Sequence, residues 1–315
     1  MYNVIIYILM ILLIIFSVIY FIVKYYFQQV VVREVTSEDV MFKEQIKRGL
    51  IDNEFYKSLK KEEFFIESKD SLRLRGIYIK SNNESNKTMI FVHGITVGLA
   101  YSIKYISMFL EKGWNVLIYD QRRHSKSEGK YSTYGYYEKE DLDLFVNWVI
   151  NKKGEGEIIG LHGESMGAAT VLQYAKINKF AKFIISDCAF SSLNELLERK
   201  VKEKGALLKP ILKLMSKRAV RKAKFSFNFI SPIEVVRKTS IPIMFIHGDK
   251  DKFVPWDMSV AMYDSKEVGI KRLYIAKGAR HAQSIEVNKF KYEEEVMKFV
   301  DEVLNNTDNL NKGLY

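Results

Sequence analysis

Short apolar segments alternate with helical segments from residue 89 onward. Six apolar runs of strand length occur in this part of the chain: residues 89–92, 116–119, 158–161, 183–186, 243–246 and 272–275. Helical spacing of apolar residues marks four segments between and after them: 102–111, 139–151, 166–177 and 286–304. Strands that alternate with helices form parallel βαβ units, because a parallel pair needs a long crossover connection. The sequence therefore predicts an α/β fold, with a mostly parallel central sheet and helices on both faces.

An antiparallel hairpin is predicted ahead of these parallel strands. Residues 64–68 and 72–79 have the composition of strands, and the second alternates apolar and polar side chains. Lys69-Asp70-Ser71 supplies the turn between them.

The pentapeptide Gly163-Glu164-Ser165-Met166-Gly167 follows the third apolar strand and precedes a helix rich in small residues. A serine in such a sharp turn adopts strained backbone angles that expose its hydroxyl, and the flanking glycines let the turn close. The pentapeptide alone occurs often by chance, so its place between a strand and a helix carries the argument. We interpret Ser165 as a candidate nucleophile.

A serine hydroxyl needs a base to remove its proton and an acid to orient that base. Asp251 lies in the loop after the fifth apolar strand, and His281 lies in the loop after the sixth. Catalytic groups of α/β sheets gather at these strand ends, so we expect both side chains beside Ser165. Asp249 is more typical of a turn cap. Asp187, at the end of the fourth strand, stays open as an alternative acid.

The other four histidines have positions typical of structural roles. His93, His124 and His247 are expected to brace loops, and His162 to be buried beside the serine turn. No carboxylate or second histidine stands at ligand spacing, which disfavours a metal site. We expect no metal and no cofactor.

Residues 64–304 resemble an α/β hydrolase and are similar to a membrane-anchored bacterial group described as serine aminopeptidase-like or BEM46-like hydrolases. The matching pieces, besides the serine turn, are Phe91-Val92-His93-Gly94, Tyr119 to His124, Ser127-Glu128-Gly129, Thr133, Gly135, the loop from His247 to Pro255, and His281.

The resemblance implies that the backbone N–H groups of Ile95 and Met166 form an oxyanion hole. Relatives usually read Arg-Gly-His-Gly where this chain has Arg122-Arg123-His124-Ser125, a departure that concerns the packing of that loop. Activities in the group include hydrolysis of esters, thioesters and amides, so the resemblance does not define the substrate.

The N-terminal segment predicts a membrane anchor. Residues 4–23 carry no charge, and twenty helical residues span about 30 Å, the thickness of the hydrocarbon core. A cleaved signal peptide would need a basic N-terminus and a small-residue cleavage site, and neither is present. Lys24, Arg33 and Lys43 follow the span and no basic residue precedes it, which favours a cytoplasmic catalytic domain. The extracellular side stays open, because a large domain often crosses regardless of a few charges.

The expected organisation is an anchor over residues 1–27, a juxtamembrane connector over 28–61, the hydrolase domain over 62–306 with a cap insert at about 191–232, and a tail over 307–315. Between Arg199 and Lys224 the cap holds eleven lysines and arginines against one acid. Its apolar stripe comprises Leu208, Ile211, Leu212 and Met215. Two interpretations remain open: a basic solvated face, or a surface that lies on anionic lipid headgroups and admits an acyl substrate.

Composition narrows the alternatives further. The formal net charge of +11 has no nucleic-acid-binding motif beside it, so nucleic acid is not an expected partner. The single cysteine, Cys188, excludes an internal disulfide framework and is expected in the core.

Together these features predict a membrane-tethered serine hydrolase that cleaves a carboxylic ester or related acyl bond of a small molecule through an acyl-enzyme on Ser165. Carboxylic esters or lipid-derived acyl groups near the membrane are the preferred substrates. The alternatives are a peptidase or amidase of the same fold, and a catalytically silent binding module.

Overall fold

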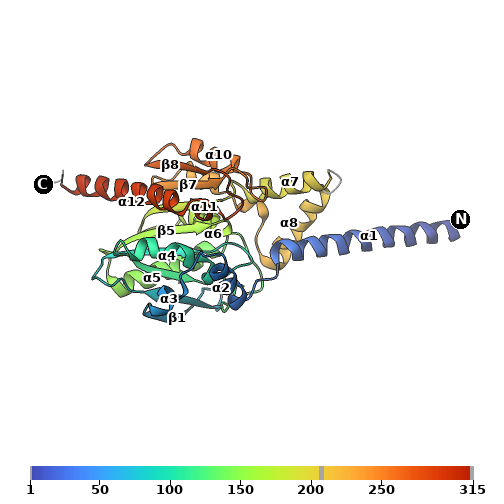
Figure 1. Cartoon of the computed structure of the whole chain (residues 1–315). Coiled ribbons are helices and arrows are strands. Elements are labelled where there is room, and N and C mark those ends of the chain that lie inside the picture. The colour runs from blue at the N-terminus through green and yellow to red at the C-terminus, as the bar shows by residue number, and fades with distance from the viewer. Residues whose placement is uncertain (1, 206–208, 313–315) are drawn as a thin grey trace.

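The computed structural model describes residues 2–205 and 209–312. Within these residues eight strands form one sheet in the order β1-β2-β4-β3-β5-β6-β7-β8 (Figure 1). The strands are β1 (Lys61–Glu67), β2 (Arg73–Ile79), β3 (Lys87–Val92), β4 (Asn115–Tyr119), β5 (Ile158–Glu164), β6 (Ala181–Asp187), β7 (Ile243–Gly248) and β8 (Lys271–Ala276). β2 pairs antiparallel with both β1 and β4, and the remaining neighbours pair parallel. The predicted hairpin and mostly parallel sheet are confirmed.

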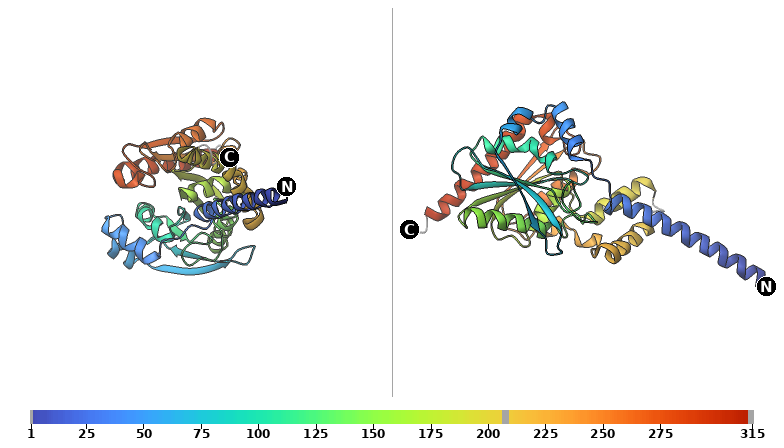
Figure 2. Two further views of the ribbon diagram at one scale, coloured as in Figure 1. Left: turned by 90° about the vertical axis from the view of Figure 1, so that its right-hand side faces the viewer. Right: turned by 90° about the horizontal axis from the view of Figure 1, so that it is seen from below.

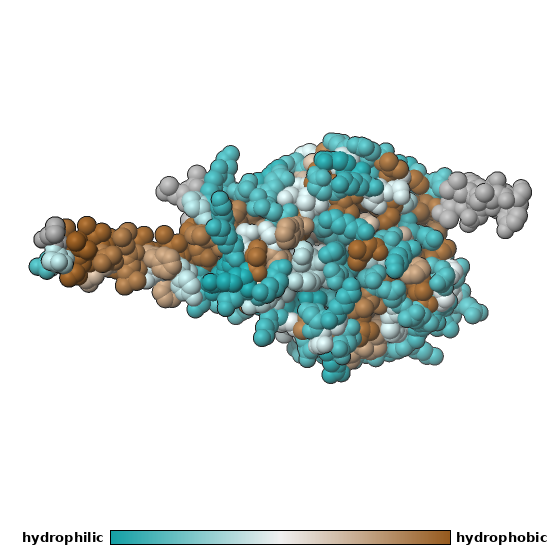
Figure 3. Space-filling model, turned by 180° about the vertical axis from the view of Figure 1, so that it is seen from behind, coloured by the Kyte–Doolittle hydropathy of each residue, from teal (hydrophilic) through white to brown (hydrophobic). Residues whose placement is uncertain are grey.

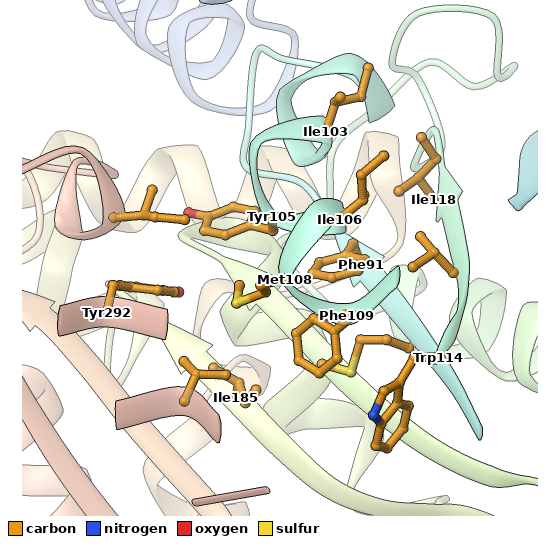
Figure 4. Packing of buried hydrophobic residues seen from close by; sticks show 14 of the residues in the cluster. Phe91, Ile103, Tyr105, Ile106, Met108, Phe109, Trp114, Ile118, Ile185 and Tyr292 are labelled. Carbon is orange, nitrogen blue, oxygen red and sulfur yellow. The ribbon is translucent and has the colours of Figure 1, made fainter. Parts of the chain in front are cut away.

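Helices cover both faces of the sheet, as the right-hand view of Figure 2 shows. One face carries η1 (Leu99–Ser102), α4 (Ile103–Leu110), α11 (Ser284–Val287) and α12 (Lys289–Lys312). The other carries α5 (Glu138–Lys153), α6 (Met166–Tyr174), α9 (Pro232–Val236) and α10 (Asp257–Ser265). Each face buries its own apolar cluster, and Figure 4 shows the first, in which Phe91, Tyr105, Phe109 and Trp114 meet between β3 and α4.

Several predicted boundaries differ from the structure, among them the end of the third apolar strand and the course of the last helix. β5 continues to Glu164, beyond its predicted end at residue 161, so the serine turn follows the strand directly. The predicted helix 286–304 is divided between α11 and α12 at Asn288. The side chain of Asn288 accepts a hydrogen bond from the Lys291 N–H, so it caps the start of α12, a role for which asparagine is favoured.

The N-terminal residues form one long helix, α1 (Tyr2–Val31), which projects from the domain (Figures 1 and 3). Among the described residues it alone is long and apolar enough to cross a membrane. Its last turns pack on the domain through Val23, Phe27 and Val31, which repeat every four residues on one face. Helices α2 (Glu38–Lys47) and α3 (Asn53–Ser58) follow, and Met41 of α2 is buried in the core cluster beside α4.

The insert between β6 and β7 forms a cap beside α1. It contains α7 (Leu193–Lys204), α8 (Lys209–Ala223) and η3 (Phe227–Phe229), followed by α9. Ile211, Leu212 and Met215 of the predicted apolar stripe face a third cluster that they share with α1. Leu208 and residues 313–315 of the predicted tail lie outside the described residues, and residues 307–312 of that tail belong to α12.

Candidate active site

The serine turn joins β5 to α6 in the strained geometry that its sequence predicts. Ser165 has φ 55° and ψ −114°. A Cβ atom on Gly163 would lie 2.3 Å from the Gly167 carbonyl oxygen, and one on Gly167 would lie 2.0 Å from the Val92 carbonyl oxygen. Only glycine therefore fits at positions 163 and 167.

Ser165, His281 and Asp251 form a hydrogen-bonded row. The Ser165 Oγ lies 2.8 Å from His281 Nε2, and His281 Nδ1 lies 2.6 Å from Asp251 Oδ2. Asp251 and His281 lie in the loops after β7 and β8, at the same edge of the sheet as Ser165. The structure thus brings together the three residues that the sequence analysis selected.

The environment of Asp251 favours its charged form. Burial opposes the carboxylate, but hydrogen bonds from His247 and His281 outweigh burial and hold the pKa of Asp251 well below its usual range. The second carboxylate oxygen accepts hydrogen bonds from the backbone N–H groups of Phe253 and Val254, at 2.8 and 2.9 Å. The carboxylate is therefore ionised and fixed in position.

The two competing carboxylates contact other groups. Asp187 accepts hydrogen bonds from the Ser284 and Tyr292 hydroxyls, at 2.9 and 3.1 Å. Asp249 accepts one from the Gly278 N–H and so ties together the loops after β7 and β8. Asp251, in contrast to these two carboxylates, contacts the imidazole of His281.

The other histidines hold neighbouring loops. His93 Nε2 accepts a hydrogen bond from the Gln121 N–H, and His247 contacts both Asp251 and the Ser259 hydroxyl. Burial lowers the pKa of His93, brings that of His124 to about 4 and that of His162 to about 3. These three rings are therefore neutral near pH 7.

The two predicted oxyanion donors lie beside the serine. Met166 begins α6, where the first N–H groups of a helix have no acceptor within it. Ile95 follows Gly94, which approaches Ser165 so closely that a Cβ on Gly94 would lie 3.4 Å from that of Ser165. Ile95, Met166 and Ser165 also line one common cavity.

A buried ion pair behind the serine was not predicted from the sequence. The Lys104 ammonium lies 2.7 Å from the Glu164 carboxylate and donates to the Ala282 carbonyl at 3.1 Å, so it joins the residues next to Ser165 and His281. The Lys104 side chain is 1% exposed. Burial alone would lower the pKa of Lys104, but the charge of Glu164 outweighs burial and raises it to about 12.

Cys188 lies beside the row, where its Sγ and the ligand atoms of Asp251 and His281 are all within 4.8 Å of one another. Burial raises the pKa of the Cys188 thiol well above its ordinary value. A protonated thiol is a poor metal ligand, because the thiolate is the form that coordinates.

Two cavities meet at Ser165. The larger, about 390 Å³, lies between α1 and the cap and has mostly apolar walls. The smaller, about 270 Å³, includes His281, Gly94 and Tyr101. Ile95, Arg33 and Phe253 line both cavities, so a molecule bound across Ser165 would place one end in each. The contribution of Arg33 and the end of α1 was not predicted from the sequence.

The strand order, the strained serine turn and the hydrogen-bonded row define the class of this protein as an α/β hydrolase fold. Residues 87–204 match the family described as alpha/beta hydrolase fold. The Bacillus subtilis protein YqkD is 35% identical over 280 residues, which are 88% of this chain and 91% of YqkD. The mouse alpha/beta hydrolase domain-containing protein 17C is 24% identical over 250 residues, 78% of this chain and 69% of that protein.

Solved structures agree on the fold. The Pyrococcus furiosus esterase Pf2001 has a TM-score of 0.67 at 23% identity and covers 86% of this chain and 96% of its own. The Pyrococcus horikoshii acylaminoacyl peptidase has a TM-score of 0.58 at 21% identity, over 78% of this chain and 42% of its own. The family match and the similarity to YqkD show that the chain belongs to the alpha/beta hydrolase superfamily, which confirms the predicted family and fold.

Proposed function

We propose that this protein is a serine hydrolase that cleaves carboxylic esters through an acyl-enzyme. The observation that carries the proposal is the row Ser165–His281–Asp251, with distances of 2.8 and 2.6 Å. His281 is partly exposed, with 22% of its side chain accessible, and both His281 and Ser165 line the smaller cavity, so a substrate bound there can reach the imidazole and the serine hydroxyl.

The chemistry follows from these positions. The Ser165 Oγ attacks the ester carbonyl carbon while His281 Nε2 takes the hydroxyl proton, and the carbonyl oxygen becomes an oxyanion. The N–H groups of Ile95 and Met166 stabilise that charge. The C–O bond then breaks and His281 gives its proton to the departing alcohol. Water repeats the sequence on the acyl-enzyme and releases the acid, while Asp251 orients the imidazole throughout.

We further propose that α1 anchors the protein in a membrane as an uncleaved single span. The window of α1 that qualifies as a span has none of its residues buried in the domain, and the helix is uncharged up to Lys24. The basic residues that follow the span support a cytoplasmic catalytic domain.

The basic cap is proposed to lie on anionic headgroups. α8 packs beside α1, and a groove between them is lined by apolar residues of α1 together with Lys217, Arg218 and Arg221. Arg218 lies over the ring of Tyr20, near the end of the proposed span, and this position supports a contact between the charge and the headgroups. Replacing Lys217 and Arg221 by glutamine should reduce ester hydrolysis in vesicles containing phosphatidylglycerol. Equal activity of this variant and the unaltered protein would count against the lipid contact.

The decisive experiment is labelling of the purified full chain with a fluorophosphonate probe, with mass spectrometry to locate the adduct. We expect an adduct on Ser165 and none in Ser165→Ala. Hydrolysis of p-nitrophenyl butyrate and of the corresponding anilide, measured in parallel, separates an esterase from an amidase. A folded protein that is neither labelled nor active on either compound would favour a binding module instead.

A further inference from the structure

The membrane helix itself forms one wall of the larger cavity. Four residues from its last turns line this space, Tyr25, Tyr26, Gln29 and Val30, and Arg33, just beyond the end of the helix, lines it as well. α7 and α8 form the opposite wall, with Leu196, Leu212 and Met215 among their contributions, and Ser165 and Met166 lie at its base. The cavity of about 390 Å³ thus has walls from the anchor and the cap, and its volume is typical of small-molecule sites.

The end of α1 is held firmly against the catalytic domain. The last carbonyl groups of a helix receive no hydrogen bond within it, and the domain supplies donors to those of Val30 and Val31. The Tyr134 hydroxyl donates to the Val30 carbonyl at 2.7 Å, and the Ser132 N–H donates to the Val31 carbonyl at 3.0 Å. Arg123 donates to the next two carbonyls, at 2.8 and 2.7 Å.

The charge of Arg123 suits this position, although its backbone conformation is unfavourable. A guanidinium at the C-terminal end of a helix complements the helix dipole. Arg123 has φ 71°, in the left-handed region that favours glycine, so the chain accepts backbone strain where this side chain meets α1. The wall formed by α1 is therefore a fixed part of the site.

The cavity opens close to the membrane surface. Lys24 is the first charged residue of the chain, which places the headgroup level near it. Gln29, at the rim of the cavity, follows five residues later, or about 7.5 Å along the helix axis. The apolar surface of α1 continues from the hydrocarbon core to the cavity along Tyr25 and Tyr26, which also line the cavity.

We propose that α1 is a substrate-binding element as well as an anchor, and that the substrate is an acyl ester of a membrane lipid whose acyl chain passes along α1 into the 390 Å³ cavity. The leaving group occupies the smaller cavity beside His281, which protonates it. This proposal rests on the proposed role of Ser165 as the nucleophile.

Substitutions on two faces of α1 test the wall. Val30→Trp places a large ring in the cavity, whereas Gln28→Trp is a matched control, because Gln28 is exposed and does not line the cavity. The ratio of kcat/KM for p-nitrophenyl decanoate to that for the acetate is measured for the full chain in detergent micelles. Each buried methylene favours the longer ester by about fourfold.

We expect the ratio to be well above one in the unaltered protein, to fall at least tenfold in Val30→Trp, and to stay the same in Gln28→Trp. Equal ratios in the two variants would overturn the role of α1. Fluorophosphonate labelling of Ser165 in every variant separates this outcome from failure of the proposed function, in which no protein would be labelled.

The membrane source of the substrate has its own test. The full chain is placed in vesicles that contain dimyristoyl phosphatidylglycerol, or in vesicles without it that are mixed with separate vesicles of this lipid. Release of myristate within minutes is expected in the first arrangement, at least tenfold faster than in the second. Equal rates would show that the ester reaches the site through water and would overturn loading from the bilayer.

Discussion

Replacement of Lys104 by methionine should destabilise the fold more than any surface substitution. The Lys104 ammonium contacts the Glu164 carboxylate at 2.7 Å, and neither side chain is more than 4% exposed. Methionine fills similar volume but leaves the Glu164 charge buried, with the Tyr105 hydroxyl as its remaining hydrogen-bond donor among the described residues. Breaking a buried pair in this way costs roughly 3–5 kcal/mol, equivalent to a fall in Tm of about 10 °C for a domain of this size.

The partner variant makes this expectation specific. Glu164→Gln removes the other charge, and the double variant Lys104→Met with Glu164→Gln removes both charges of the pair. The free energy of unfolding of all four proteins, measured by urea denaturation in detergent, should give a coupling energy of about 2–3 kcal/mol. The view that this pair is shielded from water and tightly coupled would be refuted by either of two results. One is a loss of unfolding free energy below about 1 kcal/mol in Lys104→Met, and the other is a double variant whose loss equals the sum of the two single losses.

The remaining predictions concern the acid and the serine turn. Asp251→Asn should lower kcat/KM by about 10³- to 10⁴-fold, because the carboxylate no longer orients His281, whereas Asp187→Asn should change it less than tenfold; the reverse order in an ester assay would exchange their roles. Burial, reinforced by Glu164, raises the pKa of Asp187 to about 6, so the folded state binds this proton more tightly than the unfolded state. The stability that protonation of Asp187 contributes is present below about pH 4 and is lost as pH rises to about 6. The free energy of unfolding, measured across pH 4–8, should therefore fall in the unaltered protein relative to Asp187→Asn as pH rises. Gly167→Ala should yield no folded protein, by circular dichroism, because its Cβ would lie 2.0 Å from a backbone oxygen; a folded variant with unchanged activity would contradict the geometry of the turn.

Much of the site could be predicted because its residues stand at strand ends. Ser165, Asp251 and His281 each follow an apolar strand, and parallel strands bring their carboxyl ends to one edge. The sequence favoured Asp251 but left Asp187 open, because both follow strands and the path of each loop decides which carboxylate meets the imidazole.

The buried ion pair, and the cavity wall that α1 forms, could not be predicted for a different reason. A lysine on a helix is normally exposed, and Lys104 is buried only because the serine turn and the loop after β8 both fold over it. The contact of α1 with the cap likewise joins segments nearly two hundred residues apart. Arg123 did carry a signal, since the family resemblance implies glycine at this position, and the Arg123 side chain donates hydrogen bonds to the carbonyls of Val32 and Arg33 at the end of α1.

The single cysteine offers a practical consequence. Cys188 is buried and burial raises its pKa, so maleimide reagents will react with it slowly in the folded protein. A cysteine introduced at an exposed position of α1, such as Gln28, would then be the preferred site of attachment for a fluorophore, with the native thiol left in place. Quenching of that fluorophore by lipids brominated at known depths would test the proposed insertion of α1 in a bilayer and measure the depth of the labelled turn.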